Sequence, residues 1–119
     1  MKNDESIEDY LEAIHILAES GGDVHRAEVA RRLGVSQPAV TKAVKRMCEL
    51  GYIRMEGMHI YLTERGSERA AGVYDRHRDI REFLLRLGVD EKNAEDDACR
   101  IEHVIGEETY IAIKKFIGK

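Results

Sequence analysis

The stretch RAEVARRLGVSQPAVTKAVKRMCELGYI, residues 26–53, contains two runs with helical periodicity that are separated only by Gly-Val-Ser. We expect helices over about residues 26–33 and 37–50. Gly34 can adopt the positive φ that ends the first helix, and the Ser36 hydroxyl can cap the second. Two short helices joined by such a tight turn predict a helix-turn-helix.

The second of these helices has two faces of different chemistry. Its apolar side carries Val40, Val44 and Met47. The opposite side carries Pro38, which a first helical turn tolerates, and then Thr41, Lys42 and Lys45. Small groups can approach thymine methyl groups, hydrogen-bonding groups can reach base edges, and cations can bind phosphate. This composition indicates a recognition helix for double-stranded DNA. The alternative is a helical hairpin whose lysines are simply solvated.

The segment GYIRMEGMHIYLTERG, residues 51–66, is short, β-prone and turned at Gly57, so it predicts a two-stranded hairpin. A hairpin in this position is typical of a winged helix-turn-helix, in which the wing reaches the flanking backbone or minor groove. Arg54 and His59 are candidate wing contacts, and Arg26 is a candidate phosphate clamp. The candidate DNA-binding residues are Arg26, Ser36, Gln37, Pro38, Thr41, Lys42, Lys45, Arg54 and His59.

The composition is that of an ordinary soluble globular protein, with 119 residues, 35% charged and 43% hydrophobic. The formal net charge is −4, yet residues 24–65 hold eight basic against four acidic side chains. A basic middle can attract phosphate while the acidic remainder binds a cation. Because no apolar run could span a bilayer and no signal core is present, we expect a cytoplasmic protein without a membrane partner. Its two cysteines are expected to be free thiols.

The rest of the chain also has helical periodicity. We expect helices over about residues 4–20, 64–87, 91–105 and 107–117. A single proline and the absence of repeats favour a compact chain without a flexible linker. The predicted fold class is therefore mainly α, with one small hairpin.

The segment DDACRIEHVIGEET, residues 96–109, raises the question of a metal site. Together with the preceding Glu95, its Cys99, Glu102 and His103 fall within roughly 100° of arc on a helix. They border the buried side, where desolvation is costly unless the polar groups share a partner. A divalent transition metal binds thiolate, carboxylate and imidazole together. The alternative is that Cys99 is a core thiol and the other side chains form a solvated edge.

Two other segments carry polar side chains that a metal could bind. Asp9 and Glu12 lie opposite the apolar stripe of the first helix, on a face that Ile16 suggests is covered. His77 projects into the apolar stripe of the helix expected over 64–87. A lone histidine on an apolar face is more often a core residue than a ligand. Here the acidic groups elsewhere need a cation, which favours the ligand.

Three motifs, IEDYLEAIHIL (residues 7–17), VYDRH (73–77) and ACRIEH (98–103), resemble those of the diphtheria toxin repressor family of metal-dependent transcriptional regulators. The resemblance implies a winged helix-turn-helix DNA-binding region over residues 1–65 and a helical metal-binding and dimerisation region over 66–119. It also implies a homodimer that binds a palindromic operator when loaded with metal and represses metal homeostasis genes. The implied metal ligands are Asp9, Glu12, His77, Cys99, Glu102 and His103, with Glu95 as a further candidate.

The resemblance is mixed between two branches of the family. Asp9 and Glu12 look like the manganese-responsive branch, whereas Cys99 looks like the iron-responsive branch. Arg81 and Glu95 replace a carboxylate and a histidine of the iron branch, so its ancillary metal site is lost or is rebuilt with Glu95. Because a thiolate favours softer metals, we expect Fe(II) ahead of Mn(II) as corepressor. Zn(II), Co(II) or Ni(II) are expected to substitute in vitro.

Two other classes of function remain open at this point. In a metal-independent or small-ligand-responsive winged-helix regulator, the polar face of residues 95–103 would be incidental and no stoichiometric metal would bind. In a metallohydrolase, histidine, cysteine and glutamate around zinc would activate water. No candidate general base stands apart from the proposed ligands, so an enzyme is not expected.

Overall fold

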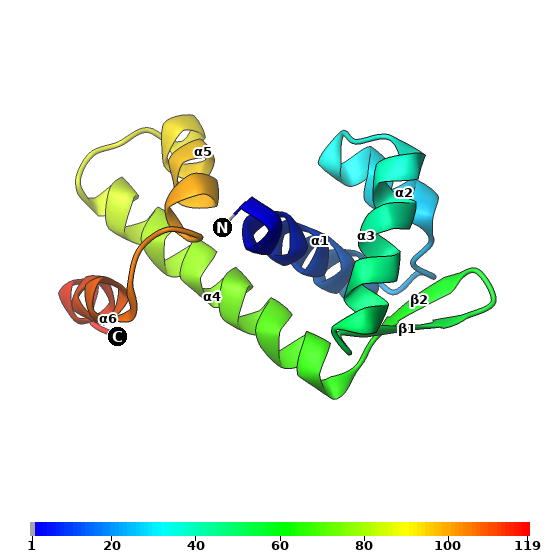
Figure 1. Cartoon of the computed structure of the whole chain (residues 1–119). Coiled ribbons are helices and arrows are strands. Elements are labelled where there is room, and N and C mark those ends of the chain that lie inside the picture. Colours follow the sequence, from blue (N-terminus) through cyan, green and yellow to red (C-terminus); the bar gives the residue numbers. More distant parts are fainter. Residues whose placement is uncertain (1) are drawn as a thin grey trace. The chain divides into compact units, whose positions relative to one another are not determined.

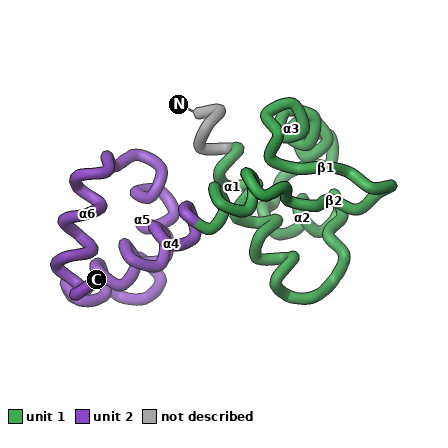
Figure 2. Tube along the Cα trace, turned by 90° about the horizontal axis from the view of Figure 1, so that it is seen from below, with its two compact units in different colours: residues 1–71 green, residues 72–119 purple. Residues whose placement is uncertain are grey.

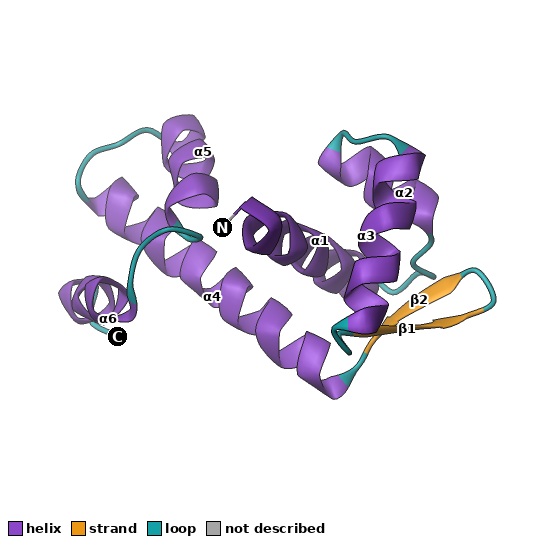
Figure 3. Ribbon diagram, viewed as in Figure 1, coloured by secondary structure: helices purple, strands orange, loops and turns teal. Residues whose placement is uncertain are grey.

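The computed structural model describes the backbone of residues 2–119 and the side chains of residues 7–119 (Figure 1, Figure 3). The elements in chain order are α1 (Lys2–Glu19), α2 (Arg26–Leu33), α3 (Gln37–Glu49), β1 (Ile53–Glu56), β2 (His59–Leu62), α4 (Glu64–Arg86), α5 (Glu91–Ile101) and α6 (Glu107–Phe116). The predicted mainly helical class is confirmed, including the hairpin. Among the described helices, none is long and apolar enough to cross a membrane.

The chain separates into two compact units, which Figure 2 shows in different colours. The first unit extends to Ala71, and the second comprises Gly72–Lys119. The boundary falls within α4, so the early turns of this helix belong to the first unit and the later turns to the second.

The first unit is built around a continuous apolar core. Its buried side chains come from α1 (Ile7, Leu11, Ile14), from α2 and α3 (Val29, Val40, Val44, Met47) and from the hairpin (Ile53, Ile60). The α1 members recur at the three- and four-residue spacing that places side chains on one helical face. Burying each such side chain contributes about 1.5–3 kcal/mol. The core therefore holds the three helices and the hairpin together as one body.

The turn between α2 and α3 forms as its residues predict. Gly34 has a φ of 69°, and its N–H donates to the carbonyl of Ala30 at 2.9 Å. The Ser36 hydroxyl accepts a hydrogen bond from the N–H of Ala39 at 3.2 Å and so caps α3. These two interactions end one helix and begin the next within three residues, which confirms the predicted helix-turn-helix.

The hairpin is antiparallel and is fastened to the helices. β1 and β2 pair in a register that runs from Ile53 opposite Leu62 to Glu56 opposite His59. Gly57, with a φ of 61°, makes the turn. The N–H of Ile60 donates to the carbonyl of Val24 at 2.8 Å, which connects the hairpin to the segment between α1 and α2.

The start of α4 packs tightly against the base of the hairpin. A Cβ at Gly66 would lie 1.9 Å from the carbonyl oxygen of Tyr52, so only glycine fits at this position. Arg69, one turn later, donates to the Tyr52 hydroxyl at 2.5 Å and to Oε2 of Glu8 at 3.0 Å. Burial raises the pKa of Tyr52, but hydrogen bonds from Arg69 and Arg65 outweigh burial and lower it. A polar network thus joins α1, α4 and the hairpin within the first unit.

The second unit contains charged side chains in its interior. Asp79, on α4, is 5% exposed and accepts hydrogen bonds from the Tyr110 hydroxyl at 2.6 Å and from Nζ of Lys119 at 2.9 Å. Burial raises the pKa of Asp79, but the bonds from Tyr110 and Lys119 outweigh it and hold that pKa below its usual value. This buried carboxylate attaches α6 and the residues after it to α4.

The helix predicted over residues 91–105 is shorter in the structure, because α5 ends at Ile101. The chain then tightens into turns, in which the N–H of Val104 donates to the carbonyl of Ile101 at 3.0 Å. Arg76 of α4 donates to the carbonyls of Glu102 and Ile105, both at 3.1 Å. The guanidinium thus supplies hydrogen bonds to two carbonyls that lie beyond the end of α5.

Candidate metal centre and nucleic-acid interface

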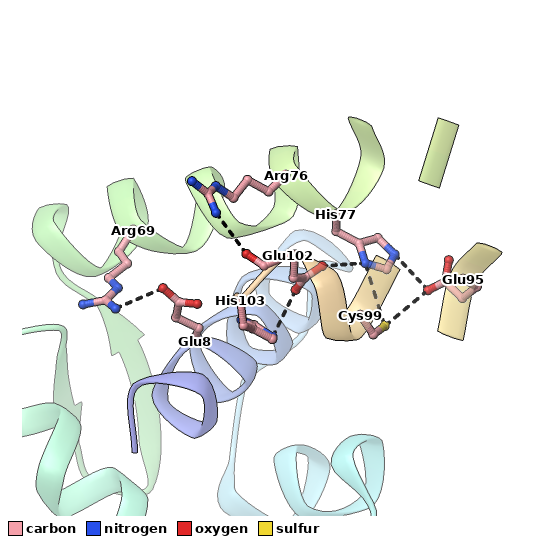
Figure 4. A network of polar contacts seen from close by, with 8 residues as sticks. All are labelled: Glu8, Arg69, Arg76, His77, Glu95, Cys99, Glu102 and His103. Carbon is pink, nitrogen blue, oxygen red and sulfur yellow. Dashed lines mark hydrogen bonds and ion pairs between the residues drawn. The ribbon is translucent and has the colours of Figure 1, made fainter. Parts of the chain in front are cut away.

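Three side chains of the second unit meet where they could hold one cation (Figure 4). His77 lies on α4, and Glu95 and Cys99 lie one turn apart on α5. Nε2 of His77 is 2.9 Å from Oε2 of Glu95, and Nδ1 of His77 is 3.8 Å from Sγ of Cys99. One ligand atom from each residue lies within 4.8 Å of the other two. Imidazole, carboxylate and thiolate are donors that transition metals accept, so this donor set fits a divalent metal.

Two further predicted ligands, Glu102 and His103, follow directly after α5. Oε1 of Glu102 is 2.7 Å from Nδ1 of His77, and Oε2 is 3.4 Å from Nε2 of His103. The side chains of Glu102 and His103 are only 1% and 3% exposed. The structure therefore brings five of the predicted ligands together within the second unit, with the Glu102 carboxylate between two imidazoles.

The contacts around His77 change its protonation. Its pKa is raised from 6.5 to about 11 by the hydrogen bond to Cys99 and then by that to Glu102, which together outweigh the lowering caused by burial. At neutral pH the ring is therefore a cation beside carboxylates. A metal ion that binds this ring competes with its proton.

Glu95 has a second cationic partner on α4. Nε of Arg81 lies 3.0 Å from Oε1 of Glu95, while Oε2 of the same carboxylate faces His77. Arg81 follows His77 by four residues, so both side chains leave the same face of α4. From the sequence, Arg81 was expected only to replace a carboxylate of the iron-responsive branch. Its spacing from His77 was the signal that it belongs to this cluster.

Asp9 and Glu12, the remaining predicted ligands, lie on α1 in the first unit. Both side chains are partly buried, and they follow the opposite side of α1 from the fully buried Leu11 and Ile14. That they share a cation with the ligands of the second unit stays a prediction.

The predicted DNA-reading face of α3 is exposed. Gln37, Pro38, Thr41, Lys42 and Lys45 all lie at the surface, while Val40, Val44 and Met47 are buried in the first unit. Ser36 is also exposed, although its hydroxyl already caps the helix. The helix therefore separates a core face from a polar face that could enter a major groove.

The predicted wing residues are held by interactions within the hairpin region. Arg54 pairs with Glu56 at 3.2 Å, and its guanidinium lies 4.6 Å from the Tyr61 ring centroid. The His59 ring stacks on Tyr61 at 4.0 Å, and its Nδ1 is 3.3 Å from Oδ1 of Asp23. Arg54 is exposed, whereas the His59 side chain is 21% exposed. His59 therefore helps to fasten the wing, a role that the sequence pattern did not indicate.

Arg26, the predicted phosphate clamp, begins α2 and is partly buried. Its Nε is buried and has no hydrogen-bond partner among the described residues. The residue before it, His25, donates its N–H to Oε1 of Glu28 at 3.0 Å. This bond fixes the first turn of α2 beside the arginine.

Known protein families match both parts of the chain. The family model described as "Iron dependent repressor, N-terminal DNA binding domain" matches residues 4–59. The model described as "Iron dependent repressor, metal binding and dimerisation domain" matches residues 63–119. The chain belongs to the iron-dependent repressor family. The resemblance to the diphtheria toxin repressor family is thereby confirmed.

Individual members of the iron-dependent repressor family are similar along nearly the whole chain. An uncharacterized HTH-type transcriptional regulator of Methanocaldococcus jannaschii is 39% identical, over 97% of this chain and 94% of its own length. The transcriptional regulator MntR of Escherichia coli is 40% identical, over 97% of this chain and 75% of its own length. The structure of a manganese-dependent transcriptional repressor in complex with manganese superposes with a TM-score of 0.88 at 27% identity, over 94% of this chain and 52% of that chain.

Membership of the iron-dependent repressor family settles the class of function. Members are metal-dependent transcriptional repressors with a DNA-binding part and a dimerisation part, and they are not enzymes. The predicted class, a metal-dependent repressor, is confirmed. The chain spans about half the length of the solved manganese-dependent repressor.

Proposed function

We propose that the chain acts in the cytoplasm as a homodimer that binds a palindromic operator when loaded with Fe(II), and with Mn(II) as the second choice, to repress metal homeostasis genes. The observation that carries the proposal is the meeting of His77, Glu95 and Cys99 in one unit. The proposed ligands are Asp9, Glu12, His77, Cys99, Glu102 and His103, with Glu95 as a seventh.

The chemistry of the ligands supports iron ahead of manganese. The Cys99 thiolate is a soft donor, and soft donors favour Fe(II), Co(II), Ni(II) or Zn(II) over Mn(II). The carboxylates of Asp9, Glu12 and Glu102 are hard donors that Mn(II) accepts, so manganese stays the second candidate. Zn(II), Co(II) and Ni(II) bind such mixed sets in vitro, so affinity alone does not identify the physiological metal.

The surface around α6 supports the homodimer. Val104, Ile111 and Phe116 are large apolar side chains with exposed fractions of 68%, 44% and 63%. Exposed large apolar side chains favour contact with another protein surface. The match of this region to a dimerisation domain makes a second copy of the chain the natural partner.

Metal loading would act through the arrangement of the two units. A bound divalent cation supplies one partner that carboxylates of α1 and ligands of the second unit can share. Without it, the clustered carboxylates repel one another and the units sample several arrangements. The recognition helices of a dimer must lie about 34 Å apart to enter successive major grooves. A tenfold preference for the competent arrangement in the loaded chain contributes about 1.4 kcal/mol per site to DNA binding.

DNA binding titrated with single metals under anaerobic conditions tests the proposal. A duplex is first selected from a random pool in the presence of Fe(II), and its affinity is then measured by fluorescence anisotropy. We expect the selected duplex to bind only with metal present. Asp9→Ala and His103→Ala should each weaken metal-dependent binding at least about tenfold.

The matched control for these variants is Lys92→Ala. Lys92 lies on α5 and forms an exposed ion pair with Asp96 at 3.1 Å, so its loss should leave DNA affinity unchanged. A wild-type chain that binds the duplex equally well with and without metal would contradict the proposal. Unchanged affinity of both ligand variants would contradict the proposed ligand set.

A further inference from the structure

The carboxylate of Glu95 is shared between two partners on α4. Oε1 lies 3.0 Å from Nε of Arg81, and Oε2 lies 2.9 Å from Nε2 of His77. Sγ of Cys99 lies 4.0 Å from the same Oε2. The oxygen that faces the candidate ligands is therefore Oε2, and the other oxygen is already bound to a guanidinium.

This arrangement restricts how Glu95 can bind a cation. While Arg81 holds Oε1, only Oε2 is left for a metal next to His77 and Cys99, so Glu95 would bind it through one oxygen. One carboxylate oxygen, one imidazole and one thiolate suit metals that accept few, softer donors, such as Fe(II), Co(II) and Zn(II). Mn(II) favours oxygen-rich sets with more ligands, and a carboxylate that offers both oxygens would suit it better.

Stability alone does not account for the Arg81–Glu95 pair. The side chains are 36% and 49% exposed, and an ion pair with that exposure contributes about 0–1 kcal/mol. The ion pair instead orients the Glu95 carboxylate, so that Oε2 faces His77 and Cys99. Groups that orient a metal ligand in this way change metal affinity by about 10–100-fold when they are removed.

We propose that Arg81 is a positioning residue that sets the metal selectivity of the site, because it holds Oε1 of Glu95 and leaves Oε2 alone for the cation. The inference rests on the proposed function to the extent that this cluster holds the corepressor. It assigns a role to a residue that is not itself a ligand.

The test compares Co(II) and Mn(II) affinities of the full-length chain by competition with a chelator. Arg81→Ala should lower the ratio of the Mn(II) to the Co(II) dissociation constant at least about tenfold. The absorption spectrum of the Co(II) complex should also change, since it reports the number and geometry of the ligands around cobalt. The ratio is measured within one variant, so a partial loss of folding affects both metals alike.

The control is Arg78→Ala. Arg78 lies on the same helix and forms an exposed ion pair with Asp75 at 2.8 Å, so we expect the wild-type ratio and spectrum. In a Glu95→Gln background, Arg81→Ala should change the ratio by less than about threefold, because the group that Arg81 positions has been altered.

Three outcomes would overturn the inference: an unchanged ratio in Arg81→Ala, an equal change in Arg78→Ala, or a full effect of Arg81→Ala in the Glu95→Gln background. The last would mean that the guanidinium acts by its charge and not through Glu95. None of these metal-affinity measurements requires DNA. If DNA binding did not depend on metal, the proposed function would be wrong. The ratio of metal affinities would still test the role of Arg81.

Discussion

The two units of the chain differ in what fills their interiors. The first unit has an apolar core from three helices and a hairpin. Within the described part of the chain, the buried polar or charged residues are His77, Asp79 and Glu102, and all three belong to the second unit. Apolar burial does not depend on protonation or on ions, whereas buried charges do. The stability of the first unit should therefore depend little on pH and ions. The stability of the second unit should depend on both.

The largest effect that would sharpen this contrast is a core truncation in the first unit. Met47 is 0% exposed, so Met47→Ala should lower the free energy of unfolding by about 2–5 kcal/mol. Denaturant unfolding measures the change. Thr41→Ala, on the exposed face of the same helix, is the control and should change stability by less than about 0.5 kcal/mol. A cost below about 1 kcal/mol for Met47→Ala would show that the apolar core is not what holds this unit.

The next effect concerns pH and the second unit. His77 has a pKa of about 11 in the folded chain against 6.5 as its ordinary value, so the ring carries a proton that a metal must displace. Co(II) affinity should therefore rise about tenfold per pH unit between about pH 7 and 8.5 from this proton alone. In Cys99→Ser, which removes the hydrogen bond that contributes most to the raised pKa of His77, the rise should become smaller. Affinity that stays flat over this range would contradict the protonated ring.

The same group affects the stability of the chain without metal, in the opposite direction. A raised pKa means that His77 contributes its full stabilisation below pH 6.5 and loses it as the pH rises toward about 11. Chemical unfolding followed at pH 7 and pH 10 in the presence of a chelator measures this loss. The Met47→Ala cost, which arises in the apolar core, should be the same at both pH values.

The smallest effect is expected at the buried carboxylate that holds α6. Tyr110→Phe removes the 2.6 Å hydrogen bond to Asp79 and should cost about 1 kcal/mol of unfolding free energy near neutral pH, since Lys119 remains as a partner. Because this bond lowers the pKa of Asp79, the cost should shrink as the pH falls through and below 3.8, its ordinary value. A cost that does not change with pH would point to packing of the ring instead.

Local chemistry in the sequence predicted the helix-turn-helix well. Gly34 and Ser36 end and begin helices through contacts with residues three or four positions away, so their roles depend on little else. The polar and apolar faces of α3 followed from spacing for the same reason. The wing was found from its turn residue, but the contact of His59 with Asp23 depends on how the hairpin packs against the segment before α2.

Contacts between distant segments were harder to predict. After α5 ends at Ile101, the carbonyl of Glu102 accepts a hydrogen bond from Arg76, which is 26 residues earlier in the chain, and no local signal identifies such a donor. The residue types and spacing of His77, Cys99 and Glu102 made them proposed ligands, whereas the pairing of Arg81 with Glu95 depends on how α4 and α5 face each other. When two helices each carry several charged residues, the sequence alone does not show which acid pairs with which base.

Arg76 gives the second unit a property that none of its helices has alone. The guanidinium donates to the main-chain carbonyl of Glu102, pairs with Glu107 in the first turn of α6 at 3.1 Å, and lies 4.9 Å from the Tyr110 ring centroid. The guanidinium group is planar and rigid, so its contacts are held in a fixed relative geometry. A backbone displacement at Glu102, a proposed metal ligand, would therefore be transmitted to the first turn of α6, in the proposed dimer region, through the single side chain of Arg76.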